Sequence, residues 1–213
     1  FSDEMNGTKL IALRKEMKQA HQNLTMLPFF MKACSIAMLD NPIINSHVDN
    51  DLDADGFIQR YVVKHDHNFN IAIDSKDGLT VPVVKKVQEK SILAINRDLQ
   101  SMRMKVDSSS LSAEDFQDGT FSVSSVGNIG GRYFVPTILR PQVCIIAIGQ
   151  AHKIAKYEED PSSKDGYKFV PAEVINFSIS ADHRIVDGAT VARFAQRMKQ
   201  LIENPNLMLP NLS

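Results

Sequence analysis

The sequence predicts an α+β fold in which helices pack on a mixed, largely antiparallel sheet to form a two-layer sandwich. Two observations support this prediction. Segments rich in β-branched and aromatic residues are interspersed with amphipathic segments, and short polar turns join most of the predicted strand pairs. The chain has 213 residues, of which 43% are hydrophobic, and this is enough for a substantial core. We expect residues 1–213 to form a single domain.

Four segments have the apolar spacing of helices. The first carries Leu10, Leu13 and Met17 about one turn apart and offers Asn6 or Thr8 as a cap. The second is strongly apolar, and the last places its apolar residues on one face. In chain order, the predicted helices are 6–24, 27–42, 90–105 and 188–204, with a short helical turn at 110–115.

Seven segments have the composition of strands, with β-branched and aromatic residues between turn signals. Pro82 places the fourth of them at a sheet edge, because proline cannot donate to a ladder. The polar, turn-rich stretch from Lys156 to Tyr167 is predicted to be a loop. In chain order, the predicted strands are 43–48, 56–65, 68–74, 78–84, 119–127, 142–150 and 168–180.

Charge and cysteine content exclude several classes of protein. The 24 basic and 25 acidic side chains leave a net charge of −1, which predicts neither nucleic-acid nor anionic-membrane binding. The sequence contains no run of about 18 apolar residues, so no transmembrane helix is predicted. Cys34 and Cys144 lie in apolar surroundings and are interpreted as buried thiols of a reducing compartment. The chain begins at Phe1, so we expect it to be part of a longer protein.

An acidic run has part of the spacing of a calcium loop. Asp51, Asp53, Asp55 and Gly56 occupy its first, third, fifth and sixth positions. The twelfth position, which should be a bidentate glutamate, is Val62, and the flanking segments are predicted strands. An ordinary hairpin loop is therefore the favoured interpretation, with calcium binding as the alternative.

Two further patterns have a structural interpretation beside a functional one. His65 and His67 would share one face of a strand, as two metal ligands do, but no third ligand is evident, and we expect structural histidines and no metal. The glycines of the stretch 127–131 do not have the phosphate-binding spacing and precede no helix, so turn glycines are expected.

The stretch "SISADHRIVDGATVARF", residues 178–194, has the composition of a reactive centre. His183 ends an apolar strand, and Asp187 and Gly188 follow it just before a predicted helix. A histidine in this position is suited to act as a general base with a supporting carboxylate. The residues alone also allow a histidine that is merely hydrogen-bonded near a turn.

The segment "SADHRIVDGA" resembles the H-x-x-x-D-G signature of the dihydrolipoamide acyltransferases, the E2 components of the 2-oxo acid dehydrogenase complexes. The resemblance covers essentially the whole chain. Within the family, the sequence is most similar to the branched-chain E2 enzymes. Antibiotic-modifying and condensation enzymes of the same fold typically have H-H-x-x-x-D-G, whereas Asp182 precedes His183 here. The other blocks that carry the resemblance are 27–49, 67–87, 119–149 and 203–210.

The resemblance implies a chloramphenicol-acetyltransferase-like fold and a homotrimer with active sites at the subunit interfaces. Trimers of this family assemble into cores of 24 or 60 subunits that work with E1 and E3 components. The lipoyl and subunit-binding domains would lie N-terminal to this chain. The location implied is the mitochondrial matrix in a eukaryote and otherwise the cytoplasm. The apolar tail "NPNLMLPNLS" either docks on its own domain or anchors one trimer to the next.

The resemblance also implies roles for five residues. His183 matches the catalytic base that takes the proton of the attacking thiol, and Ser124 matches the donor to the tetrahedral oxyanion. Asp187 matches an aspartate that holds the loop and pairs with an arginine, for which Arg14 is the candidate. Lys90 stands where relatives often have a basic residue near the phosphates of coenzyme A. No metal is implied.

The predicted function is acyl transfer between dihydrolipoamide, carried on a lipoyl domain, and coenzyme A. A branched-chain acyl group is expected, with acetyl or succinyl transfer and a catalytically silent structural core as alternatives. Two features depart from the family pattern. Asn70 stands where many members have glycine, and the loop from Lys156 to Tyr167 is longer than usual.

Overall fold

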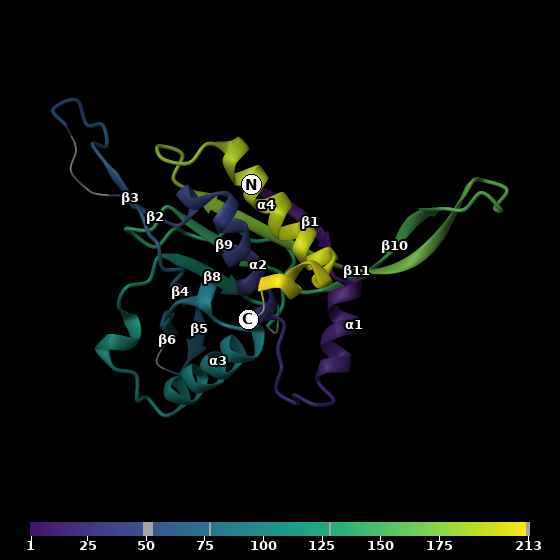
Figure 1. Ribbon diagram of the computed structural model, residues 1–213, viewed down its shortest axis with the longest axis horizontal. Helices are drawn as coiled ribbons and strands as arrows, with labels where there is room; N and C mark the ends of the chain where they lie inside the picture. Colours follow the sequence, from purple (N-terminus) through teal and green to yellow (C-terminus); the bar gives the residue numbers. More distant parts are fainter. Residues whose placement is uncertain (49–52, 77, 128, 212–213) are drawn as a thin grey trace.

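The computed structural model describes residues 1–48, 53–76, 78–127 and 129–211 (Figure 1). Within these ranges, the α-helices are α1 (Thr8–Met17), α2 (Leu27–Asp40), α3 (Ile92–Asp107) and α4 (Gly188–Glu203). Four 3-10 turns accompany them: η1 (Pro42–Ile44), η2 (Val87–Glu89), η3 (Ala113–Phe116) and η4 (Pro205–Asn211). The strands are β1 (Ser2–Asn6), β2 (Ser46–Val48), β3 (Tyr61–Val63), β4 (Phe69–Ile71), β5 (Ile73–Ser75), β6 (Gly78–Thr80), β7 (Val83–Val84), β8 (Phe121–Ser125), β9 (Cys144–Ile148), β10 (His152–Glu159) and β11 (Tyr167–Ala181).

A seven-stranded sheet forms the centre of the domain. Its strand order is β1-β11-β9-β8-β4-β7, and β10 pairs with the first half of β11. The pairs β4–β8 and β8–β9 are parallel, whereas the other pairs of this sheet are antiparallel. Figure 1 shows α2 and α4 crossing the same face of the sheet. The predicted α+β class with a mixed, largely antiparallel sheet is thus confirmed.

The two faces of the sheet differ in chemistry because side chains alternate along each strand. One face is apolar and packs on the helices: the Phe121 ring lies 5.3 Å from that of Phe69 and 6.1 Å from that of Phe194 on α4. The opposite face of β8 and β11 carries serines, among them Ser122 and Ser178, which are buried. The candidate catalytic serine belongs to this polar face.

Asn70, which was expected to depart from the family pattern, is integrated into the polar face. Its side chain donates to the carbonyl oxygen of Val81 at 3.1 Å and accepts a 2.6 Å hydrogen bond from Gln142, which also accepts from Ser122. Gly119 makes room for it, because a Cβ there would lie 1.7 Å from Asn70 Oδ1. The Asn70 side chain is therefore accommodated by a neighbouring glycine.

Several element boundaries differ from the prediction. The first helix ends at Met17 rather than at 24, since the chain turns back to bury Leu24 and to hydrogen-bond Thr25 to Asn96 of α3. The strand predicted at 43–48 is reduced to β2 by the 3-10 turn η1. Two strands were missed, β1 and β10, and β10 occupies the start of the predicted Lys156–Tyr167 loop.

The predicted buried thiols are confirmed. Cys34 and Cys144 are free and buried, and burial raises the pKa of the Cys144 thiol to about 12 and that of Cys34 further. In the described part of the chain, no helix is long and apolar enough to cross a membrane.

Residues 53–57, which include the end of the acidic run, form a turn around one carboxylate. Asp53 Oδ1 accepts hydrogen bonds from the backbone amides of Asp55 at 3.0 Å and Phe57 at 2.8 Å, which close the loop. Asp51, the first position of the calcium-loop alternative, lies outside the described residues.

His65 is exposed beside Asp66, whereas His67 is buried, so the two rings do not form the shared face of a metal site.

Candidate active site

His183 lies in a tight turn between β11 and α4. The start of the turn is fixed to the segment before β9, because the Asp182 amide donates to the carbonyl oxygen of Val143 at 2.8 Å. The amides of Ile185 and Val186 both donate back to the carbonyl oxygen of Asp182, and the Val186 side chain is buried. These contacts leave the imidazole of His183 exposed to solvent on a rigid support.

The two residues on either side of His183 in the sequence, Asp182 and Arg184, form an ion pair. Arg184 donates to Asp182 through Nε at 2.9 Å and through Nη2 at 2.6 Å, which is a bidentate geometry. The hydrogen bond from Arg184 is the main reason that the pKa of the Asp182 carboxyl is lowered. Sequence reasoning assigned Asp182 no role in the site, although the Asp-x-Arg spacing around the histidine was the available signal.

Asp187 holds the start of α4. It is the N-cap residue, and its carboxylate accepts from the Thr190 amide at 2.7 Å and from the Thr190 hydroxyl at 3.1 Å. The backbone hydrogen bond from Thr190 is the largest cause of the lowered pKa of this carboxyl. These contacts make Asp187 the cap of α4, and its role in holding the catalytic loop stays a prediction.

The predicted pair between Asp187 and Arg14 is wrong. Arg14 instead donates to the carbonyl oxygen of Leu24 at 3.3 Å. Helix α1 lies against the far end of α4, where Lys9 donates to Asn204 at 2.8 Å. Since α4 has 16 residues, its two ends are roughly 24 Å apart, which places Arg14 far from the N-cap.

Ser124 is half-buried near the end of β8, with its side chain on the polar face of the sheet. Among the residues that the structure describes, none forms a hydrogen bond with its hydroxyl, which is free to donate to a ligand. Ser125 follows it and points to the opposite face. The two serines of "VSSVG" are therefore not equivalent.

His183 and Ser124 are far apart within one chain. Ser124 pairs with Ala147, which pairs with Ser178, so Ser124 is level with Ser178 two strands away, about 10 Å in the sheet. β11 then continues for three residues to Ala181, about 10 Å further, before the turn begins. The backbone of Ser124 is thus roughly 14 Å from that of Ala181, where the chain enters the turn that carries His183.

Lys90 lies directly before α3 and is held in place by two contacts. Its Nζ donates to Asp98 at 2.6 Å, and its carbonyl oxygen accepts a 2.9 Å hydrogen bond from Lys32. Lys32 is buried on α2, and this burial lowers its pKa. Ser91 caps α3 by accepting from the Ala94 amide at 3.2 Å. Lys90 therefore precedes the N-terminus of α3, and its ammonium group lies on Asp98 in the second turn of that helix.

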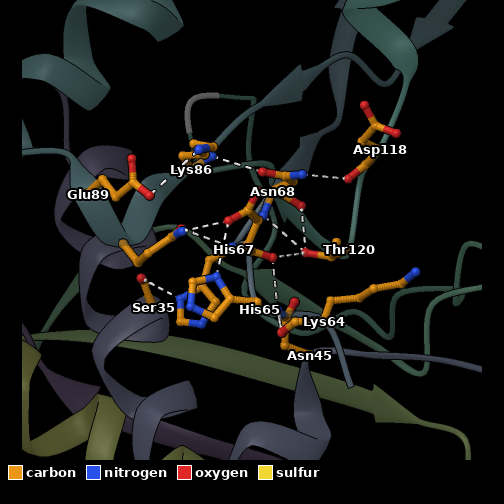
Figure 2. Close-up of polar contacts among 12 residues, drawn as sticks. Ser35, Asn45, Lys64, His65, His67, Asn68, Lys86, Glu89, Asp118 and Thr120 are labelled. Carbon is orange, nitrogen blue, oxygen red and sulfur yellow. Dashed lines mark hydrogen bonds and ion pairs between the residues drawn. The ribbon is translucent and has the colours of Figure 1, made fainter. Parts of the chain in front are cut away.

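A polar cluster fixes the start of the parallel pair β4–β8, whose far end carries Ser124 (Figure 2). Asn68 donates to the carbonyl oxygen of Asp118 at 2.8 Å and accepts from the Lys86 amide, and its own amide donates to Thr120 Oγ1 at 3.0 Å. His67 Nδ1 lies 2.7 Å from the Ser35 hydroxyl of α2. Burial lowers the pKa of His67 to about 4.

The architecture and the exposed histidine turn after β11 define the chloramphenicol-acetyltransferase-like class. A solved chloramphenicol acetyltransferase matches 95% of this chain with a TM-score of 0.60 at 12% identity, which shows the common fold. A dihydrolipoamide acetyltransferase of Azotobacter vinelandii matches 98% of this chain and 82% of its own with a TM-score of 0.86 and 30% identity. In that enzyme a serine, a histidine and an asparagine have been investigated for their role in catalysis.

The family model for 2-oxoacid dehydrogenases acyltransferase (catalytic domain) matches residues 1–210. The chain therefore belongs to this family. The lipoamide acyltransferase components of the mitochondrial branched-chain α-keto acid dehydrogenase complexes of Caenorhabditis elegans and Bos taurus are 37% and 39% identical to it over its whole length. The chain spans 46% and 42% of these two relatives.

Proposed function

We propose that this domain is the catalytic core of a dihydrolipoamide acyltransferase that moves a branched-chain acyl group between dihydrolipoamide and coenzyme A. One observation carries the proposal: His183 and Ser124 are both accessible, yet they lie at separate positions of one chain. Such an arrangement supplies two complementary half-sites, one to each neighbour in a ring of subunits. The names of the two branched-chain relatives described above support the branched-chain substrate, and acetyl or succinyl groups are the alternatives.

The proposed reaction begins with a thiol of coenzyme A, which is mostly protonated at pH 7 because such thiols have a pKa of about 8.5. His183 takes the proton as the sulfur attacks the thioester carbonyl of acyl-dihydrolipoamide. The carbonyl π electrons move to oxygen, and Ser124 of a neighbouring subunit donates a hydrogen bond to this oxyanion. The intermediate then collapses, the bond to the lipoyl sulfur breaks, and His183 returns its proton to that leaving thiolate.

Rigid support of His183 follows from the contacts around it. The Asp182–Arg184 pair and the backbone bonds to Asp182 hold the turn, and Asp187 fixes the first turn of α4. A base held in one orientation loses little entropy when it reaches the transition state. In this proposal Asp187 and Asp182 are positioning residues, and they do not contact the substrate.

We also propose that Lys90 contacts a phosphate of coenzyme A. Its backbone lies just before the N-terminus of α3, where free backbone amides favour anions, and its ammonium group is paired with Asp98 in the second turn. The ion pair with Asp98 is partly exposed, with 30% and 39% of the two side chains accessible, so exchange of Asp98 for a phosphate requires little desolvation.

Exposed apolar surface supports assembly of the core. Tyr133 and Val135 are 81% and 78% exposed. Their segment lies near the His183 end of the sheet, because the carbonyl oxygen of Pro136 accepts a hydrogen bond from Ser180. In the tail, Met208 is buried on its own domain, whereas Leu207 and Leu209 are exposed. We propose that the first surface joins subunits into a trimer and that the two leucines anchor trimers in a 24- or 60-subunit core that works with E1, E3 and the lipoyl domain. The location would be the mitochondrial matrix in a eukaryote.

Subunit mixing tests the shared site. Assembled His183→Ala and Ser124→Ala variants are each expected to be inactive when tested separately. The kcat of the serine variant should fall by about 100-fold or more. If each site takes the two residues from adjacent subunits, every trimer that contains both variants keeps a single intact site. Random reassembly of equal amounts makes about three quarters of the trimers mixed, so about a quarter of wild-type activity should return.

The control for the serine is Ser125→Ala, which changes the other face of β8 and should retain activity. Absence of any recovery in reassembled mixtures, with wild-type protein regaining activity in parallel, would contradict the shared site. Steady-state rates with isobutyryl-, acetyl- and succinyl-coenzyme A against dihydrolipoamide test the acyl group. We expect the highest kcat/KM for isobutyryl-coenzyme A.

A further inference from the structure

The strands β10 and β11 form a two-stranded ribbon that projects far from the domain (Figure 1). Within the described residues, β10 pairs only with β11, and β1 joins the other side of β11 no earlier than Val174. The outer edge of β10 therefore presents unpaired backbone donors and acceptors to solvent. An isolated two-stranded hairpin is marginally stable in water, so this ribbon is a candidate for completion by another chain.

One face of the ribbon carries a cluster of exposed aromatic rings. Tyr157 lies opposite Phe169, with ring centroids 4.6 Å apart, and Tyr167 lies 4.9 Å from Tyr157. The exposed fractions of Tyr157, Tyr167 and Phe169 are 63%, 40% and 60%. Tyr157 is on β10 itself, so the apolar row Phe169–Tyr157 ends at the open edge of the sheet.

The charges of β10 are ordered along the strand. Lys153 and Lys156 occupy its first part, and Glu158 and Glu159 end it. A second β10 in parallel orientation would place lysine beside lysine and glutamate beside glutamate. An antiparallel β10 places the basic half of each strand beside the acidic half of the other, so the edge is complementary to itself about a two-fold axis.

We propose that β10 pairs antiparallel with β10 of a second copy of this chain, with Tyr157 opposite the same residue of the copy. In this register, Lys156 of each strand lies opposite Glu158 of the other, and a row of four aromatic rings crosses the resulting four-stranded sheet. A two-fold axis perpendicular to the sheet keeps each side chain on its own face, so registers change in steps of two. The neighbouring register, centred on Lys156, would oppose the two lysines and is disfavoured.

This contact lies away from the candidate active site. The root of the ribbon adjoins α1, because the Glu173 amide donates to Thr8 at 2.9 Å, whereas His183 follows the opposite end of β11. The exposed leucines of η4 are near the same end of the molecule, since Lys9 of α1 contacts Asn204 just before η4. The proposed pairing thus adds a contact between copies beyond the shared catalytic site, and its tests do not use catalytic activity.

Disulfide trapping in the assembled protein tests the register. Tyr157→Cys places two thiols opposite each other across the axis, with Cα atoms about 5 Å apart, and should yield a covalent dimer under mild oxidation. The matched control is Glu159→Cys on the same strand face, whose two copies would be roughly 13 Å apart and should remain unlinked. The native Cys34 and Cys144 are buried and do not compete. Equal linking of both variants, or no dimer from Tyr157→Cys, would overturn the proposal.

A charge swap provides a second, independent test. Lys156→Glu and Glu158→Lys each place like charges opposite one another twice and should shift sedimenting species toward lower mass at moderate salt. The double variant restores both pairs in reversed order and should recover the wild-type distribution. Lys156 and Glu158 are both exposed, so circular dichroism should show an unchanged fold. A double variant that sediments like the single variants would refute the pairing, as would single variants that sediment like wild type.

Discussion

Lowering the pH should destabilise this domain through His67. The ring is only 5% exposed, and burial lowers its pKa from 6.5 to about 4. The folded state thus disfavours the protonated ring, whereas the unfolded chain binds the proton near pH 6.5. Stability from the neutral ring is therefore complete above pH 6.5 and is lost as the pH falls toward 4. Between pH 7 and pH 5, these two pKa values correspond to a loss of about 2 kcal/mol in the free energy of unfolding.

Urea unfolding at pH 7 and pH 5, at one protein concentration, measures this loss. The His67→Asn variant retains a polar atom for the Ser35 hydroxyl but cannot be protonated, so its stability should fall about 2 kcal/mol less than that of wild type over the same interval. His21→Asn is the matched control, because the His21 side chain is exposed and is not among the groups that act on the pKa of His67, so it should leave the pH dependence unchanged. An equal loss in His67→Asn and wild type would refute the reasoning.

Four further variants test other parts of the structure. Asp187→Ala removes the N-cap of α4 and should lower the free energy of unfolding by about 1 kcal/mol, as measured in urea. Gly119→Ala should destabilise by about 1–3 kcal/mol through its clash with Asn70, and Asn70→Gly in the same chain should recover most of that loss. Lys90→Ala should raise the KM for coenzyme A with little change in kcat. Removal of the residues after Pro205 should leave trimers by light scattering, and persistence of the full assembly would contradict the proposed anchor.

Local patterns predicted the parts of the fold that depend on local chemistry. The apolar spacing of the last helix placed Val191, Phe194 and Met198 on one face, and all three are buried. The strands β1 and β10 escaped prediction because their residues are mostly polar. They are strands because β11 offers them an edge to pair with, and that partner is more than 160 residues away from β1 in sequence.

The candidate site shows the same division between local and distant information. The H-x-x-x-D-G spacing selected His183 and Asp187, which the structure places in one turn and at the first turn of a helix, and their roles stay predictions. The proposed Arg14 partner was wrong because no local pattern reports which end of α4 contacts α1. The Asp182–Arg184 pair was local and was nevertheless missed, although its spacing was visible in the sequence.

The register of the central sheet supplies what no motif contains. Ser124 is level with Ser178 because β8, β9 and β11 pair in one particular alignment, and His183 is beyond the end of the last strand. Conserving either side chain alone would leave half a site, and a change of two residues in the β8–β9 register would move Ser124 by about 7 Å along the sheet. If the two half-sites meet between subunits, catalysis depends on sheet register and on subunit packing together. A variant that folds correctly but does not form trimers should then contain no complete site for the transition state or the product.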